Sequence, residues 1–440
     1  MPRITAPELD LRRLTLDNGL RVVLAPDTSA PVVAVAAHYD VGFRSEPVGR
    51  TGFAHLFEHL MFQGSESLPK LAHFRHVQGS GGTFNGSTHF DYTDYFEVLP
   101  SAALERALFL EADRMRAPTI SEENLRNQVD VVKEEIRLNV LNRPYGGFPW
   151  ILLPPVLYDT FANAHNGYGD FVDLEEATVE DCAAFFDSYY APANAVLTVA
   201  GDFEVDAAIA LVHKHFDDVP ARPAPKRPSF AEPAPTSEKR ADHQDRLAPL
   251  PAFAVGYRVP DPGTDLAGYT ARVALASVLT DGDAARLRQR MIYRDELVTD
   301  VSAGVGLFGM PYDARDPDTM TITAVHLPDV GTDSVLAVVD EEVARVARDG
   351  VSGDELRRTA ARWSATMFRD HDRLATRTRA IGACELLYGR GELAAELPTM
   401  IAAVTTEQVA EAAAELRPDS RAVLTITPSG EDGQAPGDAA

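Results

Sequence analysis

The chain has 440 residues, enough for two or three domains that each bury a core. It carries 41 Lys and Arg against 66 Asp and Glu, a formal net charge of −25 at pH 7. This excess of acidic residues argues against a nucleic-acid partner, because the negatively charged phosphates bind basic surfaces. Two interpretations of the charge remain: a generally acidic composition that favours solubility, or an acidic chamber that attracts basic peptides.

No targeting or membrane segment is expected. The first residues are polar and charged and lack the apolar core of a signal peptide. No run of about 18 apolar residues, the length that spans a membrane, occurs in the sequence. Cys182 and Cys384 lie far apart and lack C-x-x-C spacing. They are expected to be buried free thiols in a reducing cytoplasm, so that no metal is bound through cysteine.

The segment His55-Leu56-Phe57-Glu58-His59 carries the strongest chemical signal. It reads H-x-x-E-H, the zinc-peptidase signature in reverse order. On a helix, His55 and His59 leave the same face one turn apart, where two ring nitrogens can hold one zinc ion. Glu58 stands beside them, where a carboxylate can take a proton from water. The apolar neighbours predict a mostly buried helix, whose polar side chains need partners. A chance match is the alternative.

A glycine-rich segment, Gly79-Ser80-Gly81-Gly82, leads into predicted strand structure that ends at 95–99. Glycine permits close backbone approach, and an unpaired strand edge can take up an extended peptide through main-chain hydrogen bonds. An ordinary hairpin turn is the alternative.

A third metal ligand could come from the helix predicted to begin after Ser121, which would cap it. Within this helix Val131, Val132 and Glu135 share one face, whereas Glu134 turns away from it. The pattern favours Glu135 as ligand over Glu134. The alternative is that both are ordinary surface acids.

The segment 217–251 is rich in Pro, Ala and charged residues and lacks periodicity, which predicts an extended linker. On each side of it, strands are followed by helices. In the second half we expect strands over 252–260 and 422–427, and helices over 264–279, 333–348 and 353–367, the first capped by Thr264. The predicted domains are 1–218 and 251–430, joined by a linker over 219–250 and followed by a disordered tail over 431–440.

Taken together, these motifs resemble the pitrilysin/insulinase family of inverzincin peptidases, in the short-subunit branch that includes mitochondrial processing peptidase. The resemblance covers essentially the whole chain. Besides the H-x-x-E-H helix, it rests on segments 16–23, 41–46, 81–88, 93–96, 189–195 and 199–203. It implies an α+β fold of two homologous α/β-sandwich domains. It also implies a peptidase with one Zn²⁺ per chain, bound by His55, His59 and Glu135, with Glu58 as the catalytic base.

The resemblance also assigns residues around the metal. Asn85 matches a residue that contacts substrate on the edge strand, and Gly82 and Gly86 belong to the same motif. Gln128 occupies a position where many relatives carry a supporting Glu. Gln128 cannot carry charge, so a hydrogen-bonding role beside the metal ligands is implied.

One feature of self-sufficient relatives is missing. Their second half carries an Arg and a Tyr that bind the substrate backbone and the oxyanion. In the matching run, 286–301, those positions hold Ile292 and Thr299, which cannot replace a guanidinium or a phenol. Loss of such a donor costs roughly 10²–10³ in rate.

We therefore expect a heterodimer, in which a homologous non-catalytic subunit supplies the Arg/Tyr pair and this chain supplies the zinc. One alternative is a homodimer in which Tyr293 or Arg294 substitutes for the missing pair. Another is a zinc-binding assembly subunit without proteolytic activity. The expected substrates are peptides or unfolded segments, with leader-peptide removal or processing as one possibility.

Overall fold

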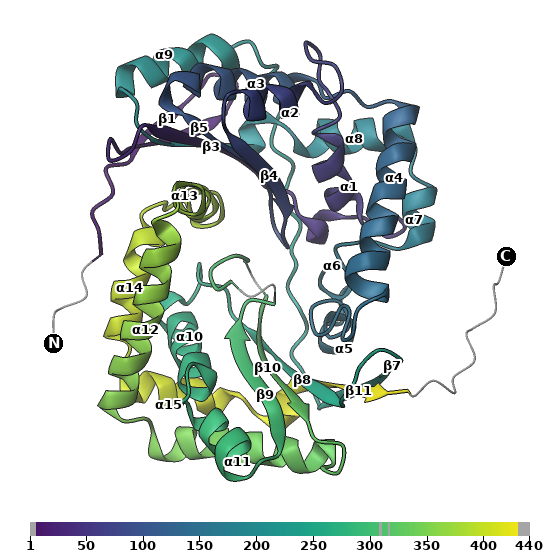
Figure 1. The fold of residues 1–440 in the computed structure, drawn as a ribbon, viewed down its shortest axis with the longest axis vertical. Helices are drawn as coiled ribbons and strands as arrows, with labels where there is room; N and C mark the ends of the chain where they lie inside the picture. The colour runs from purple at the N-terminus through teal and green to yellow at the C-terminus, as the bar shows by residue number, and fades with distance from the viewer. Residues whose placement is uncertain (1–5, 308–309, 316, 430–440) are drawn as a thin grey trace.

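Two mixed sheets, one in each half of the chain, organise the structure (Figure 1). The computed structural model describes residues 6–307, 310–315 and 317–429. Within these residues, the first sheet is formed by β1 (Arg12–Thr15), β2 (Arg21–Pro26), β3 (Val32–Tyr39), β4 (Thr83–Thr88), β5 (Thr93–Pro100) and β6 (Ala195–Gly201). The second sheet is formed by β7 (Lys239–Asp245), β8 (Ala252–Val259), β9 (Val298–Val305), β10 (Asp318–His326) and β11 (Arg421–Pro428).

The strand order is β1-β2-β6-β3-β5-β4 in the first sheet and β7-β11-β8-β10-β9 in the second. The pairs β2·β6 and β7·β11 are parallel, and the other pairs are antiparallel. The central strands β3 and β6 are buried along almost their whole length, as expected for strands covered on both faces. The predicted two-domain α/β fold is confirmed, and β4 lies at a sheet edge.

Helices pack against both sheets. Those of the first half are α1 (Phe53–Leu60), α2 (Ala72–Gly79), α3 (Leu104–Arg116), α4 (Glu122–Ile136), α5 (Pro154–Leu157), α6 (Phe161–Ala164), α7 (Phe171–Glu175), α8 (Val179–Tyr189) and α9 (Val205–Phe216). Those of the second half are α10 (Leu266–Thr280), α11 (Thr332–Asp349), α12 (Gly353–His371), α13 (Leu374–Tyr388), α14 (Leu393–Ala403) and α15 (Thr406–Glu415).

The predicted cap of α10 was wrong. Asp265, not Thr264, accepts a hydrogen bond from the backbone of Gly268. Thr264 instead donates its hydroxyl to the backbone oxygen of Asp261, within the preceding turn. By contrast, Ser121 caps α4 as predicted, by accepting from the Asn124 N–H.

Each half of the chain contributes a helix that packs against the sheet of the other half. Helix α13, from the second half, lies against β3, β5 and β6 of the first sheet (Figure 1). Gly382 permits this approach, because a Cβ there would lie 2.4 Å from the His38 ring. In the other direction, α5 packs against β7, β8 and β11. The space between the two sheets is therefore filled by helices from both halves of the chain.

The segment 219–250, predicted to be a linker, contains β7, which pairs in parallel with β11. Its last part therefore contributes to the second sheet, and the domain limits themselves stay a prediction. The tail predicted over 431–440 lies outside the described residues. In the part of the chain that the structure describes, no helix combines the length and apolarity needed to cross a bilayer.

Candidate active site

Helix α1 is held at its N-terminus by a carboxylate from the preceding loop. Glu46 accepts hydrogen bonds from the Gly52 N–H at 2.9 Å and the Ala54 N–H at 2.7 Å. It supplies the partners that a helix start needs, because the N-cap Gly52 has no side chain. His165 Nε2 lies 3.0 Å from the same carboxylate. With the apolar residues of α1 buried beneath, His55, Glu58 and His59 stay partly exposed on its other face.

Three metal-ligand side chains meet beside α1. Glu135 Oε2 lies 3.7 Å from His55 Nε2 and 3.4 Å from His59 Nε2. The ligand atoms of these three residues lie within 4.8 Å of one another, the one such group found among the described residues. Two imidazoles and one carboxylate form a donor set that suits catalytic zinc, which keeps a further position open. The residues present therefore fit a zinc ion.

The structure places Glu135, and not Glu134, beside the histidines. The Glu134 side chain is 57% exposed and pairs with Arg137 at 3.3 Å. The apolar-face argument was only partly correct, because Val132 is buried but Val131 is 42% exposed. Helix α4 reaches α1 through Val132 and its other buried side chains, and this packing brings Glu135 within reach of the histidines.

The protonation states of His55 and Glu135 suit a cation. Burial, and then His59, lower the pKa of His55 to about 4, so its imidazole is neutral at pH 7. The hydrogen bond with His59 lowers the pKa of Glu135 to about 2, which keeps it a carboxylate. Burial lowers the pKa of His59, but Glu135 and Glu58 outweigh it and raise that pKa. Neutral imidazole and ionised carboxylate are the forms that bind zinc, so His55 and Glu135 are in binding form, whereas zinc would compete with a proton for His59.

Glu58 is held by the edge strand. Thr88 Oγ1, on β4, donates to Glu58 Oε2 at 2.8 Å. A Cβ on Gly86 would lie 2.8 Å from Glu58 Cγ, so the strand can approach this closely only with glycine there. Burial raises the pKa of Glu58, and the Thr88 bond acts in the opposite direction. A carboxyl with a raised pKa is a better proton acceptor.

A cavity of about 580 Å³ opens over these groups. Its lining residues are Phe43, His55, Glu58, Gly86, Ser87, Thr88, Glu135, Trp150, Gly167, Tyr168 and Leu307. Among the described residues, Leu307 is the one from the second half that lines it. Ile292 and Thr299, which the resemblance aligns with the Arg and Tyr of self-sufficient relatives, therefore lie outside this cavity. Tyr293 and Arg294 also lie outside it, and they hydrogen bond to Asp283 and Asp295.

Two further side chains support the ligands. Tyr168 donates its hydroxyl to Glu135 Oε1 at 3.0 Å, and its ring meets the His55 ring edge-on. Gln128 is buried and donates a hydrogen bond to Asn127 Oδ1 at 2.9 Å, and its side chain contributes to the raised pKa of His59. The hydrogen-bonding role expected for Gln128 beside the metal ligands stays a prediction. Sequence reasoning missed Tyr168 and Thr88, because no local pattern marks a loop tyrosine or a strand threonine as a partner of a distant carboxylate.

The residues predicted to bind substrate lie along or just before β4. Asn85 is exposed on this strand, where it pairs with Phe96 of β5 on one side only, since β4 is the sheet edge. Gly82 precedes the strand and packs against the Val98 carbonyl. Packing alone therefore accounts for glycine at position 82, whereas the edge at Asn85 and Gly86 is beside Glu58.

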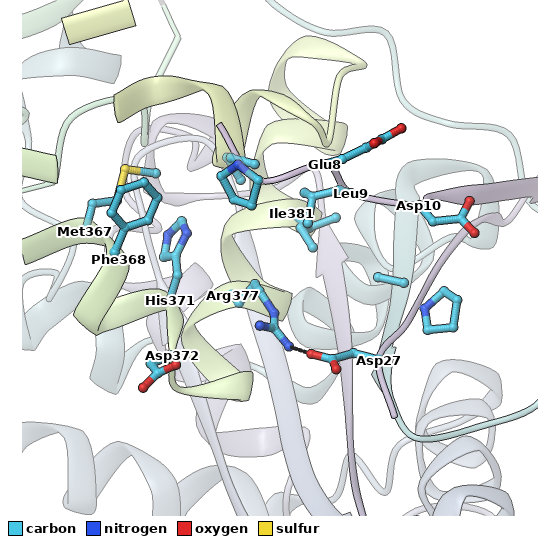
Figure 2. A pocket seen from close by; sticks show the side chains of 15 residues that line it. Glu8, Leu9, Asp10, Asp27, Met367, Phe368, His371, Asp372, Arg377 and Ile381 are labelled. Atoms are coloured by element: carbon cyan, nitrogen blue, oxygen red, sulfur yellow. Dashed lines mark hydrogen bonds and ion pairs between the residues drawn. The ribbon is translucent and has the colours of Figure 1, made fainter. Parts of the chain in front are cut away.

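A second cavity, of about 400 Å³, lies away from the metal group, where the N-terminal segment crosses α12 to α14 (Figure 2). Arg377 in its wall forms an ion pair with Asp27, so this cation is already neutralised. Met367, Phe368 and Ile381 supply apolar lining (Figure 2). Among the residues that the structure describes, no group of metal ligands lines this cavity, and the chemistry described above belongs to the first cavity.

Two domain models of one family match the chain. The model "Insulinase (Peptidase family M16)" matches residues 21–143, and "Peptidase M16 inactive domain" matches residues 176–362. The chain therefore belongs to the peptidase M16 family. The first match contains His55, Glu58, His59 and Glu135, whereas the metal group has no counterpart among the described residues of the second.

Relatives of the chain are named as zinc proteases. It is 31% identical over 298 residues to zinc protease PqqE of Helicobacter pylori, covering 65% of this chain and 64% of that protein. It is 24% identical over 413 residues to a probable mitochondrial-processing peptidase subunit beta of Arabidopsis thaliana, covering 92% and 76%. The crystal structure of a protease from Helicobacter pylori has a TM-score of 0.86 at 23% identity, covering 96% and 100%. The family resemblance and the two-domain fold are thus confirmed.

Proposed function

We propose that this chain is a zinc-dependent endopeptidase subunit that hydrolyses peptides or unfolded segments. The observation that carries the proposal is the metal-ligand group His55, His59 and Glu135 with Glu58 beside it. Of these residues, His55, Glu58 and Glu135 line one cavity. The family membership and the names of the relatives support the same class of reaction.

Each residue has a stated part in this proposal. Zn²⁺, when bound by the three ligands, would polarise the scissile carbonyl and lower the pKa of a water molecule. Thr88 occupies Glu58 Oε2, which leaves Oε1 to take the proton from the attacking water and pass it to the leaving amine. The open edge of β4 would align an extended peptide through main-chain hydrogen bonds, with Asn85 alongside.

The direct test is Glu58→Gln, assayed for zinc content and for cleavage of an unstructured peptide. The variant should keep stoichiometric zinc, because Glu58 is not a ligand, and should lose cleavage, because an amide cannot accept the proton. Continued turnover by zinc-loaded Glu58→Gln would refute the mechanism. A wild-type protein that binds zinc but never cleaves, alone or with a partner, would favour the non-proteolytic assembly subunit.

We further propose that a second, homologous subunit completes the site. Ile292 and Thr299 stand where self-sufficient relatives carry Arg and Tyr, and neither lines the cavity over Glu58. Native mass spectrometry of the chain purified from its host would test this directly. A complex with a different subunit of similar size supports the heterodimer, whereas a dimer of this chain that cleaves at full rate supports a self-sufficient homodimer.

The cytoplasmic location is also part of the proposal. It is supported by Cys182 and Cys384, which are both buried and free, as expected where thiols stay reduced. Processing of leader peptides is one substrate class that a cavity selecting for unfolded segments would accept.

A further inference from the structure

A polar cluster joins the second half of the chain to the β4–β5 hairpin that carries Thr88. Its members are Ser87, His89 and Asp94 from the hairpin, and Asp313 and Arg379 from the second half, on the β9–β10 connection and on α13. The Asp94 side chain is fully buried, and those of His89 and Asp313 are 18% and 19% exposed. Charges this deeply placed persist only when they are paired.

Every charge in the cluster has an opposite partner. Arg379 donates to both oxygens of Asp94, from Nε at 2.5 Å and from Nη2 at 2.9 Å. His89 Nδ1 lies 2.6 Å from Asp313 Oδ2, and Tyr92 donates its hydroxyl to the other oxygen. The Arg379 pair and the His89 pair therefore each link the second half to the same hairpin.

The Ser87 hydroxyl lies between the two pairs. It donates to Asp94 Oδ1 at 2.6 Å, lies 2.9 Å from His89 Nε2, and receives a hydrogen bond from Arg379. A serine hydroxyl has one hydrogen and two acceptor sites, so these three contacts use its whole capacity.

This geometry sets the protonation of His89. Arg379 lowers the pKa of Asp94 to about 2 against the effect of burial, so Asp94 only accepts and takes the one Ser87 hydrogen. His89 Nε2 must then donate to Ser87, and Nδ1 must donate to the Asp313 carboxylate. His89 is therefore an imidazolium. Burial lowers the pKa of His89, but Asp313 and Asp94 together outweigh burial and raise it, in agreement with the geometry.

The order Ser87–His89–Asp313 resembles a serine-hydrolase triad, and Ser87 lines the cavity over Glu58. A doubly protonated imidazole cannot accept the serine proton, so this arrangement does not activate a nucleophile. The cluster instead acts as a cross-link between the two halves of the chain.

We propose that the His89–Asp313 pair is a positioning device that holds Thr88, and through it Glu58, only while the two halves are docked. His89 directly follows Thr88, whose hydroxyl holds Glu58 Oε2. Separation of the halves, or loss of the His89 proton, releases the end of β4 and with it the carboxylate. The proposal rests on the proposed function, because it takes Glu58 as the proton acceptor. The charged and titratable groups that face His89 are Asp94, Asp313, Arg379, His38 and Tyr92.

The first test needs no substitution. Nuclear magnetic resonance of histidine ring carbons in the wild-type chain should show His89 as an imidazolium at pH 7. It should deprotonate only above 6.5, the ordinary histidine value. A neutral His89 at pH 7 would overturn the proposal, and this readout does not depend on zinc or on cleavage.

The second test is Asp313→Asn, with Asp333→Asn as the matched control. Asp333 also lies in the second half, but its side chain is 79% exposed and pairs with Arg240 on the surface. In the zinc-free full chain, Asp313→Asn should raise amide hydrogen exchange over 83–89 by about tenfold, the size of one lost charged hydrogen bond. The control should not change it. Equal exchange in Asp313→Asn and wild type would overturn the proposal.

Steady-state kinetics distinguish a positioning role of Asp313 from a general loss of structure. In the complete active assembly, Asp313→Asn should lower kcat with little change in KM or zinc affinity, because the cluster contacts none of the proposed ligands. Asp313→Glu should restore part of the rate, and a fall in zinc affinity equal to the fall in kcat would count against positioning. If Glu58→Gln proved fully active while the exchange result held, the proposed mechanism would fail but the cross-link would stand.

Discussion

Thr88 Oγ1 donates a 2.8 Å hydrogen bond to Glu58 Oε2, so the edge strand of the first sheet holds the proposed catalytic carboxylate. The edge that would receive a peptide and the group that would receive the proton are thus one hydrogen bond apart.

Replacing Thr88 tests this link. Thr88→Val keeps the shape but removes the donor, so kcat should fall by about tenfold, as expected when a charged acceptor loses a hydrogen bond. Thr88→Ser retains the hydroxyl and should stay within about twofold of wild type by the same reasoning. Steady-state peptide cleavage at equal zinc content measures both, and equal rates for Val and Ser variants would show that the bond is not used.

Adjacent glutamates offer a matched pair for the metal. Glu135→Gln should weaken zinc binding by more than ~100-fold, beyond the usual cost of an outer-shell change, whereas Tyr168→Phe should cost ~10-fold. Glu134→Gln should leave affinity unchanged, because Glu134 pairs with Arg137 at the surface. Competition with a chromogenic chelator measures the three zinc affinities. Loss of zinc binding in Glu134→Gln would show that Glu135 had been wrongly assigned as the ligand.

A methyl group added at Gly86, on the edge strand β4, should displace the Glu58 carboxylate. In Gly86→Ala the new Cβ would lie 2.8 Å from Glu58 Cγ, so the carboxylate or the strand must shift. The expected result is a fall in kcat of roughly 10²-fold, the size of effect seen when catalytic groups are displaced by about 1 Å. Gly79→Ala, at the end of α2, has open space around the new atom and should behave as wild type.

Glu46 should contribute to folding as the remote cap of α1. Glu46→Ala removes the partner of two backbone N–H groups and leaves His165 without its carboxylate. We expect a loss of about 1–2 kcal/mol in unfolding free energy, measured by chemical denaturation. Glu204→Ala is the control, because Glu204 precedes α9 without a capping hydrogen bond from its side chain. Equal losses of unfolding free energy in the two variants would show that Glu46 does not act as a cap of α1.

Acid should weaken the second half through Glu355. The hydrogen bond from Arg286 lowers the pKa of Glu355 from 4.5 to about 2. Since the folded pKa is depressed, the contribution to stability is present above about 4.5 and is lost as pH falls towards about 2. Thermal unfolding of wild type and Glu355→Gln should therefore differ at neutral pH and converge in acid. A constant difference across this window would contradict the assignment.

Features encoded over a few residues were predictable from the sequence. The H-x-x-E-H spacing placed His55, Glu58 and His59 on one face of a helix, since the period of the α-helix alone decides this. The expected strands over 252–260 and 422–427 match β8 and β11 closely, and the helix expected over 333–348 matches α11. The cap of α10 was misplaced by one residue, because Thr264 found a partner in its own turn and left the helix start to Asp265.

The partners of these residues were decided by tertiary structure. Glu135, Thr88 and Tyr168 come from α4, the edge strand and a loop, and only packing brings them to α1. Asp313 reaches His89 across 224 positions of sequence, a contact that no local pattern encodes. The sequence by itself determined which atoms could bind a metal and move a proton, because spacing and residue type decide that chemistry. Tertiary structure decided what holds those atoms in place, because burial and long-range pairing exist only once the two halves have packed together.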